Sequence, residues 1–257
     1  MSHLAIIGGS GFAAMSKLEI VDSRPVETDY GQPSAHLIRG RLAGRELLFL
    51  PRHGAGHAIP PHRINYRANI QALYDAGAER IVALAAVGGI SEDCGPLTLC
   101  IPDQIIDYTH GRESTFHDGL SGDGNADGHG DVVHVDFSYP YSARLRRQLS
   151  DAARDADLTI RDGVTYGVTQ GPRLETVAEI ARLQRDGCDL VGMTAMPEAV
   201  LARELGMRYA TLAFVVNWAA GKSDGIIGMD EINANLDRCA TDIYRLLISL
   251  AVQSPID

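Results

Sequence analysis

The stretch from Gly163 to Pro197 constrains the fold most, because two short apolar runs flank one amphipathic segment. The first run, 164–168, predicts a strand that ends before the Gly171-Pro172 break. The second run, 189–193, predicts another strand, and Pro197 then begins a helix. Between the runs we expect a helix that Gly187 terminates. Its apolar face is predicted from a spacing of three and four to consist of Val177, Ile180 and Ala181, with Leu183 at the edge.

Strand ends that face helix starts are where open α/β sheets bind ligands. Four side chains are predicted on this rim: Arg173, Glu175, Met193 and Thr194. A Glu just after a Gly-Pro turn suits hydrogen bonding to a neutral N–H edge. A Met followed by a Thr suits an apolar sugar face beside an anion. The alternative is an ordinary strand–helix–strand unit with a glutamate in its loop.

Other apolar runs predict further buried strands at 4–7, 47–50, 81–87 and 211–216. Alternation over 35–50, with turns expected at Gly40 and at Ala43-Gly44, indicates a hairpin. We expect helices over 69–76 and from Asp230 onward, and the latter should bury one side, made of Ile232, Leu236, Ile243, Leu246 and Leu247. We therefore predict a single α/β domain over residues 1–257, with a mixed, twisted sheet flanked by helices.

Composition limits the kinds of partner and cellular location that we expect for this protein. A net charge of −10 over 257 residues argues against nucleic acid and acidic membranes, although it leaves room for a small anionic substrate. The N-terminus lacks the pattern of a signal peptide, and no apolar run approaches the length of about 18 residues that spans a bilayer. The four cysteines are scattered without a C-x-x-C pair, which indicates a reduced, cytoplasmic protein.

The turn Gly8-Gly9-Ser10-Gly11 after the first strand predicts a phosphate cradle of backbone N–H groups and one hydroxyl. The same residues match a dinucleotide fingerprint, G-x-G-x-x-A. That fingerprint requires a complete helix before the next strand. The next apolar run, 18–22, follows too soon for a crossover helix, which disfavours a nicotinamide site.

Arg52 and His53 stand at the end of the 47–50 run. A guanidinium can bind phosphate oxygens in bidentate fashion, so this pair is predicted to bind an anion, and a surface turn is the alternative. His53 and His57 lie four apart, but the glycines between them argue against a helical metal pair, and no metal site is predicted.

A second glycine-rich run, Ser121 to Asp131, opens like a calcium loop from Asp123. Its twelfth position is His134 instead of Glu, and no helix is predicted beside it. We therefore favour a mobile surface loop over a calcium site.

Several segments resemble the trimeric nucleoside phosphorylases: GPRLETVAE from Gly171, VGMTAMPEAVLARELG from Val191, Arg52-His53-Gly54, NYRANI from Asn65, and 102–109. The resemblance covers nearly the whole chain. It implies a homotrimer with active sites at subunit interfaces, inorganic phosphate as co-substrate and no cofactor. It implies that a segment around His134 reaches the sugar pocket of a neighbouring subunit.

The resemblance also assigns roles to residues. Phosphate binding falls on Ser10, Arg52, His53, Ala86 through its backbone, and Thr194. The base and ribose would contact Val87, Gly88, Leu174, Glu175, Val191, Met193, Asn217 and Ala219. Asn217 and Glu175 are the expected catalytic residues, with the Asn217 amide donating to the purine N7 as negative charge develops there. The family places a Thr where Ala85 stands, so one hydroxyl contact is missing.

Two positions indicate the substrate. Methylthioadenosine-cleaving members carry Asp at the positions of Asn217 and Ala219, so this chain is similar to the enzymes for 6-oxopurines. Glu175 agrees, because adenine has no N1–H to give it, and an unsatisfied buried group costs roughly 1–3 kcal/mol.

The 5′ pocket differs from that of the inosine enzymes. Met229, with Ile232 one turn on, replaces a His that bonds the 5′-hydroxyl there, and a thioether wall suits a methylthio group. The expected activity is phosphorolysis of 5′-methylthioinosine, with similarity to the methylthioinosine-cleaving members. Alternatives are a general 6-oxopurine nucleoside phosphorylase, a methylthioadenosine phosphorylase, an NAD-dependent dehydrogenase and a non-catalytic nucleotide-binding module.

Overall fold

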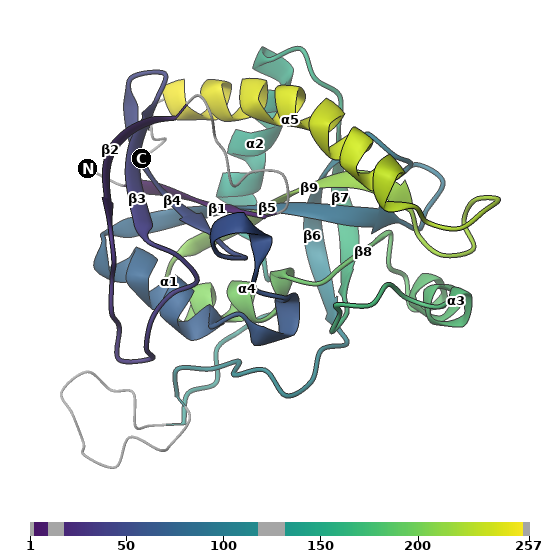
Figure 1. Ribbon diagram of the computed structural model, residues 1–257, viewed down its shortest axis with the longest axis horizontal. Coiled ribbons are helices and arrows are strands. Elements are labelled where there is room, and N and C mark those ends of the chain that lie inside the picture. Colours follow the sequence, from purple (N-terminus) through teal and green to yellow (C-terminus); the bar gives the residue numbers. More distant parts are fainter. Residues whose placement is uncertain (1–2, 10–17, 118–131, 254–257) are drawn as a thin grey trace.

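A computed structural model describes residues 3–9, 18–117 and 132–253 (Figure 1). Ser10 and the run from Ser121 to Asp131 fall outside the described residues, so the predictions made for them stay predictions. None of the helices in the described ranges has the length and apolar character that a bilayer crossing requires.

One mixed sheet forms the centre of the described structure. Its order is β2-β3-β4-β1-β5-β8-β7-β6-β9. The strands are β1 (His3–Gly8), β2 (Glu19–Arg24), β3 (Leu37–Leu42), β4 (Arg45–Pro51), β5 (Ala78–Gly89), β6 (Leu99–Asp107), β7 (Ile160–Val168), β8 (Leu190–Gly192) and β9 (Arg208–Trp218).

The sheet partly closes on itself. β9 pairs with β6 in antiparallel fashion and with β5 in parallel along most of its length, for example Ala83 with Thr211. Strands β5, β8, β7, β6 and β9 therefore form a ring, and β1, β4, β3 and β2 extend it as an open wing. The predicted mixed sheet is confirmed, and the ring is a feature that apolar runs alone do not predict.

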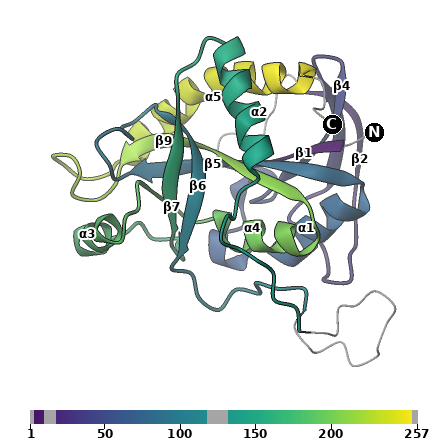
Figure 2. The same ribbon diagram turned by 180° about the vertical axis from the view of Figure 1, so that it is seen from behind.

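Five α-helices surround the sheet in the described ranges: α1 (Tyr66–Asp75), α2 (Ala143–Asp155), α3 (Val177–Arg185), α4 (Ala195–Glu204) and α5 (Met229–Val252). Short 3₁₀ turns cover Ala55–His57 and Pro61–Arg63. Helices α2 and α5 cover one face and α1 and α4 the other, while α3 lies beside the ring (Figures 1 and 2).

The central strands supply side chains to both faces because successive side chains alternate. In β1, Ala5 and Ile7 join the core under α1 and α4, whereas Leu4 and Ile6 join the core under α2 and α5. The continuous apolar runs in the sequence arise from this burial on both faces.

Some sequence expectations need correction. The hairpin turn at Ala43-Gly44 is confirmed, with φ of 49° and 75°. Gly40, however, lies inside β3, where a Cβ would stand 2.6 Å from Leu18 Cγ. The helix expected over 69–76 begins earlier, at Tyr66, because the Asn65 side chain caps it by accepting from the Ala68 N–H.

The buried side of α3 also differs from the prediction. Ile180 and Leu183 are buried, whereas Val177 is 61% exposed. Val177 is the first residue of α3, directly after the Thr176 N-cap. On α5, Ile243, Leu246 and Leu247 are buried as predicted, while Ile232 and Leu236 are partly buried.

The sheet topology contradicts a dinucleotide-binding unit. That unit needs the strand after the glycine turn to lie parallel beside the first strand. Here β1 is flanked by β4 and β5, and β2 pairs antiparallel with β3 at the sheet edge.

Candidate functional site

A cavity of ≈ 600 Å³ opens at the carboxyl ends of β1, β4, β5 and β9. Such strand ends are the usual ligand position in α/β sheets. Predicted site residues that line it are Arg52, His53, Ala86, Val87, Gly88, Leu174, Glu175, Val191, Met193, Thr194, Asn217, Ala219, Met229 and Ile232. His134 is exposed and is not part of this lining.

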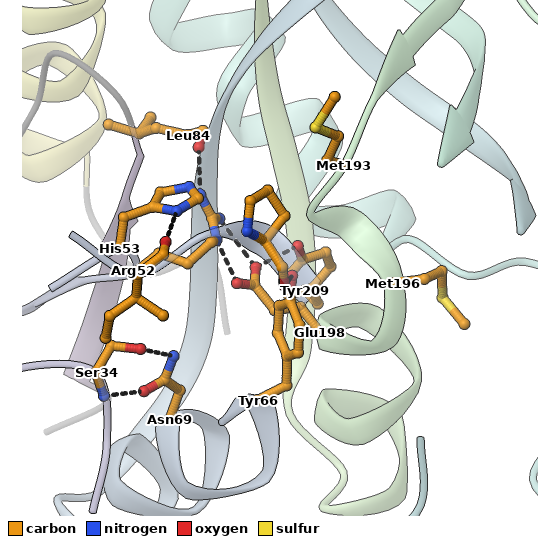
Figure 3. Close-up of polar contacts among 12 residues, drawn as sticks. Ser34, Arg52, His53, Tyr66, Asn69, Leu84, Met193, Met196, Glu198 and Tyr209 are labelled. Atoms are coloured by element: carbon orange, nitrogen blue, oxygen red, sulfur yellow. Dashed lines mark hydrogen bonds and ion pairs between the residues drawn. The ribbon is translucent and has the colours of Figure 1, made fainter. Parts of the chain in front are cut away.

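Arg52 is engaged by a partner that sequence reasoning missed. Its Nε and Nη2 donate to the two carboxylate oxygens of Glu198, the latter at 3.0 Å, and Nη1 donates to the Leu84 carbonyl at 2.9 Å. In Figure 3 the guanidinium lies between this carbonyl and the carboxylate. The Tyr209 hydroxyl also donates to Glu198, at 2.9 Å.

Arg52 is therefore not free of protein partners, and its expected role as an anion clamp stays a prediction. Of five guanidinium N–H groups, three are used within the protein, leaving one on each terminal nitrogen for a ligand. Burial lowers the pKa of Arg52, but the adjacent Glu198 carboxylate outweighs this and raises it above the ordinary value. The group stays charged, and Glu198 balances its charge.

Glu198 lies in the first turn of α4, which follows Thr194 and contains a non-helical Met196 and a cis Met196–Pro197 bond. The sequence signal was a single Glu within an apolar segment, 195–202. Isolated carboxylates in apolar surroundings are rarely buried without a charged partner. That signal predicts a buried ion pair, but it does not identify Arg52 as the other member.

His53 presents an acceptor to the cavity. Its Nδ1 lies 2.8 Å from the Ile59 carbonyl oxygen, and since a carbonyl can only accept, Nδ1 carries the hydrogen. Burial first, and then the Arg52 charge, lower the pKa of His53 to about 4. A neutral ring with a bare Nε2 accepts hydrogen bonds, so in this state His53 would accept from a hydroxyl or a protonated phosphate oxygen, and its part in phosphate binding stays a prediction.

Backbone groups and a hydroxyl complete this part of the cavity. Thr194 is the N-cap of α4, yet its side chain makes no capping hydrogen bond. An anion near a helix N-terminus is favoured by the helix dipole. On β5, a Cβ at Gly88 would stand 3.1 Å from Val191 Cγ1, so glycine avoids a tight contact where the strand passes Val191.

Glu175 and Asn217 bring a carboxylate and an amide to the same cavity. The Thr169 hydroxyl donates to Glu175 Oε1 at 2.6 Å, and burial raises the pKa of Glu175. Asn217 is 7% exposed and donates from Nδ2 to the Trp218 carbonyl at 2.7 Å. An amide nitrogen carries two hydrogens, so a second one remains for a ligand.

An apolar wall is formed by the first turn of α5 and the residue Ile227 before it. Met229 and Ile232 line the cavity as predicted for a 5′ pocket, and Ile227, which was not predicted, lines it as well. Met229 is 62% exposed, so this wall stands at the mouth of the cavity.

Arg112 fastens the loops that carry the site and was also missed. Its guanidinium donates to the carbonyls of Met193 at 2.8 Å, Met196 at 2.6 Å and Gln170 at 2.9 Å. Two of these carbonyls lie on either side of Thr194, and the third lies in the loop that leads to Glu175. In the described ranges, no group of three His, Cys, Asp or Glu side chains is placed to hold a metal ion.

Comparisons with known proteins agree with this architecture. A protein of Xylella fastidiosa, named a probable S-methyl-5′-thioinosine phosphorylase, is 56% identical over 234 residues, covering 91% of this chain and 95% of the relative. A 6-oxopurine nucleoside phosphorylase of Pyrococcus furiosus is 44% identical over 252 residues, covering 97% and 92%.

A solved structure of methylthioadenosine phosphorylase from Schistosoma mansoni, in complex with adenine, superposes with a TM-score of 0.89 at 31% identity, covering 98% of this chain and 91% of that one. The model of the phosphorylase superfamily matches residues 3–251. This chain therefore belongs to the phosphorylase superfamily.

Proposed function

We propose that this protein uses inorganic phosphate to cleave the N-glycosidic bond of 5′-methylthioinosine, releasing hypoxanthine and 5-methylthioribose 1-phosphate. The observation that carries the proposal is one cavity in which Glu175 and Asn217 meet the apolar residues Ile227, Met229 and Ile232. The first pair suits a 6-oxopurine, and the apolar group suits a methylthio substituent.

The reaction needs positioning and charge stabilisation more than a nucleophilic side chain. A phosphate oxygen forms a bond to the anomeric carbon as the bond from that carbon to the purine N9 breaks, and the bonding pair leaves with the purine. The remaining N–H groups of Arg52, the Thr194 hydroxyl and the backbone near Ala86 would orient the phosphate. His53 Nε2 would accept a hydrogen bond from a protonated phosphate oxygen or from a sugar hydroxyl.

Asn217 would act on the leaving group. Its second Nδ2 hydrogen can bond the purine N7 as negative charge accumulates there, and such transition-state bonding accelerates the step. Glu175 would accept the N1–H that hypoxanthine has and adenine lacks. Proteins named methylthioadenosine phosphorylase share the fold of this chain. Asn217 and Ala219 nevertheless favour a 6-oxopurine as the base of the substrate.

A general 6-oxopurine nucleoside phosphorylase is the second candidate, favoured by the exposure of Met229, which leaves space for a 5′-hydroxyl and its water.

The proposal includes no cofactor, a homotrimer whose neighbour supplies His134, and a cytoplasmic location. The four cysteines are free and buried, which suits a reducing compartment.

Base release from 5′-methylthioinosine, 5′-methylthioadenosine and inosine tests the proposal, with each nucleoside assayed with and without phosphate. We expect rapid, phosphate-dependent release from methylthioinosine and slower release from the other two. Equal rates with inosine would favour the general enzyme, and faster release from methylthioadenosine would overturn the assignment of the base.

A further inference from the structure

Thr169 stands directly behind the carboxylate that is proposed to read the base. Its hydroxyl oxygen lies 2.6 Å from Glu175 Oε1 and 3.3 Å from the Gly192 carbonyl oxygen. The Thr169 backbone is also hydrogen-bonded. Its N–H donates to the Gly192 carbonyl at 2.8 Å, and Arg112 donates to the Thr169 carbonyl at 3.4 Å. The backbone that carries the hydroxyl is therefore held next to Glu175.

A threonine hydroxyl has one hydrogen to give. When Glu175 is ionised, the hydrogen goes to Oε1, and Oε2 keeps its lone pairs for a donor on the ligand. When Glu175 is protonated, the hydroxyl can turn its hydrogen to the Gly192 carbonyl and accept from the carboxyl group. The short 2.6 Å contact matches the charge-assisted bond of the ionised state.

These two states read different purines. An ionised Glu175 accepts the N1–H of a 6-oxopurine. A protonated Glu175 can donate to the bare N1 of a 6-aminopurine. The protonation of this one carboxyl group therefore decides which base the cavity prefers, provided that the proposed function holds.

We propose that Thr169 is a specificity-determining residue whose hydroxyl holds Glu175 ionised and correctly turned, and thereby excludes 6-aminopurine nucleosides. Hydrogen bonding to the charged form of a carboxyl group favours that form. Burial raises the pKa of Glu175, and the hydrogen bond from Thr169 opposes this rise more than any other contact does.

Other charges near Glu175 largely offset each other. Arg173 favours its ionised form and Glu179 opposes it, but these two residues are paired with each other at 2.7 and 2.8 Å. A second cavity of ≈ 590 Å³ lies on the other side of Glu175 and adds Asp107, Tyr108, His110 and Arg182. The substrate cavity adds Arg52, His53 and His57. Within the described ranges, Thr169 is the side chain that donates to Glu175, and the backbone of Glu175 itself adds a weaker hydrogen bond.

The test compares Thr169→Val with Thr169→Ser. Valine keeps the shape and removes the hydroxyl, whereas serine keeps the hydroxyl. The readout is the ratio of kcat/KM for 5′-methylthioinosine to kcat/KM for 5′-methylthioadenosine. We expect valine to lower this ratio about tenfold at neutral pH, from the loss of one bond at a buried polar group, and serine to preserve it.

A structural role for Thr169 would reduce both substrates in parallel and leave the ratio unchanged, and that outcome overturns the proposal. An equal drop in the serine variant also overturns it. On acidification, the ratio should begin to decline at a higher pH in Thr169→Val than in the wild type. The reason is that the variant lacks the hydrogen bond that lowers the pKa of Glu175.

Failure of the proposed function would look different. If the wild type cleaves no nucleoside in phosphate, calorimetric binding of hypoxanthine and adenine to the three proteins still measures the preference. A wild type that binds hypoxanthine better, with the preference lost only in the valine variant, supports the role of Thr169. An unchanged preference in all three contradicts it.

Discussion

The guanidinium of Arg52 and the carboxylate of Glu198 are paired inside the protein, although 146 positions separate them in the chain. Their side chains are 1% and 0% exposed. Arg52 comes from the end of β4 and Glu198 from the first turn of α4, so the pair joins the open wing of the sheet to the helix that follows Thr194. The same guanidinium also faces the substrate cavity.

Replacing Glu198 by Gln should lower the free energy of unfolding by about 3–5 kcal/mol, because it leaves a buried charge without its partner. Urea unfolding at one protein concentration measures this loss. The matched control, Arg52→Met with Glu198→Leu, removes both charges and should regain most of the stability. A loss below about 1 kcal/mol in Glu198→Gln would show that the pair is solvated.

His53 should make stability depend on pH. Its pKa is lowered to about 4, while an unfolded His titrates near 6.5. As the pH falls below 6.5, the unfolded chain binds a proton at His53, whereas the folded protein binds it only near pH 4. The free energy of unfolding is therefore highest above pH 6.5 and decreases on acidification. At pH 5 this difference lowers the free energy of unfolding by about 2 kcal/mol.

The measurement is urea unfolding of the wild type and of His53→Gln at pH 8 and pH 5, without phosphate. The variant should lose less stability between the two values. His57 is also held below its ordinary pKa, mainly by burial, but it is present in both proteins. Identical pH dependence would mean that His53 is protonated in the fold.

The sequence predicted the position of the site because its signals are local. Apolar runs mark the strands, and the polar residues directly after them, such as Arg52 and Asn217, must gather where parallel strands end. Motif resemblance then assigned roles to residues that periodicity does not distinguish. The family match confirms the resemblance at the level of the superfamily, while the residue roles stay predictions.

The missed features depend on contacts between distant segments. The partner of Arg52 and the loops fastened by Arg112 join segments that only the folded sheet brings together. Thr169 and Glu175 are only six positions apart, but apolar periodicity does not predict a hydrogen bond within a loop. Gly40 was placed in a turn because glycine commonly marks turns, whereas here it makes space for Leu18.

Asn217→Ala should reduce kcat by about 10²–10³-fold, the usual effect of deleting one donor to a developing anion. The KM for nucleoside should change much less, because the bond strengthens only in the transition state. Steady-state kinetics with methylthioinosine separate the two parameters. Asn217→Asp is the matched control, and it should raise the relative rate with methylthioadenosine. Unchanged kcat in Asn217→Ala would remove this residue from the mechanism.

Met229→His should shift the preference from methylthioinosine towards inosine, because it gives the mouth of the cavity a donor for a 5′-hydroxyl. The ratio of kcat/KM for inosine to that for methylthioinosine should rise roughly three- to tenfold, the value of one hydrogen bond. Met229→Leu keeps the apolar wall and should leave the ratio unchanged. If both variants behave alike, the 5′ group lies elsewhere.

His134 provides a test of the proposed trimer. It is exposed and stands apart from the cavity of its own chain. If it completes the site of a neighbour, a mixed assembly can bring the His134→Ala and Asn217→Ala defects together in one site and leave another site with neither. A His134→Ala subunit beside an Asn217→Ala subunit then regains an intact site.

Co-expressed, differently tagged variants should therefore show more activity than the average of the two parents. The control pairs His134→Ala with the double variant His134→Ala and Asn217→Ala, which has no intact His134 to donate and should stay at the average. Activity at the average in both mixtures would place each site within one subunit. In that case the exposed position of His134 would have no role in turnover.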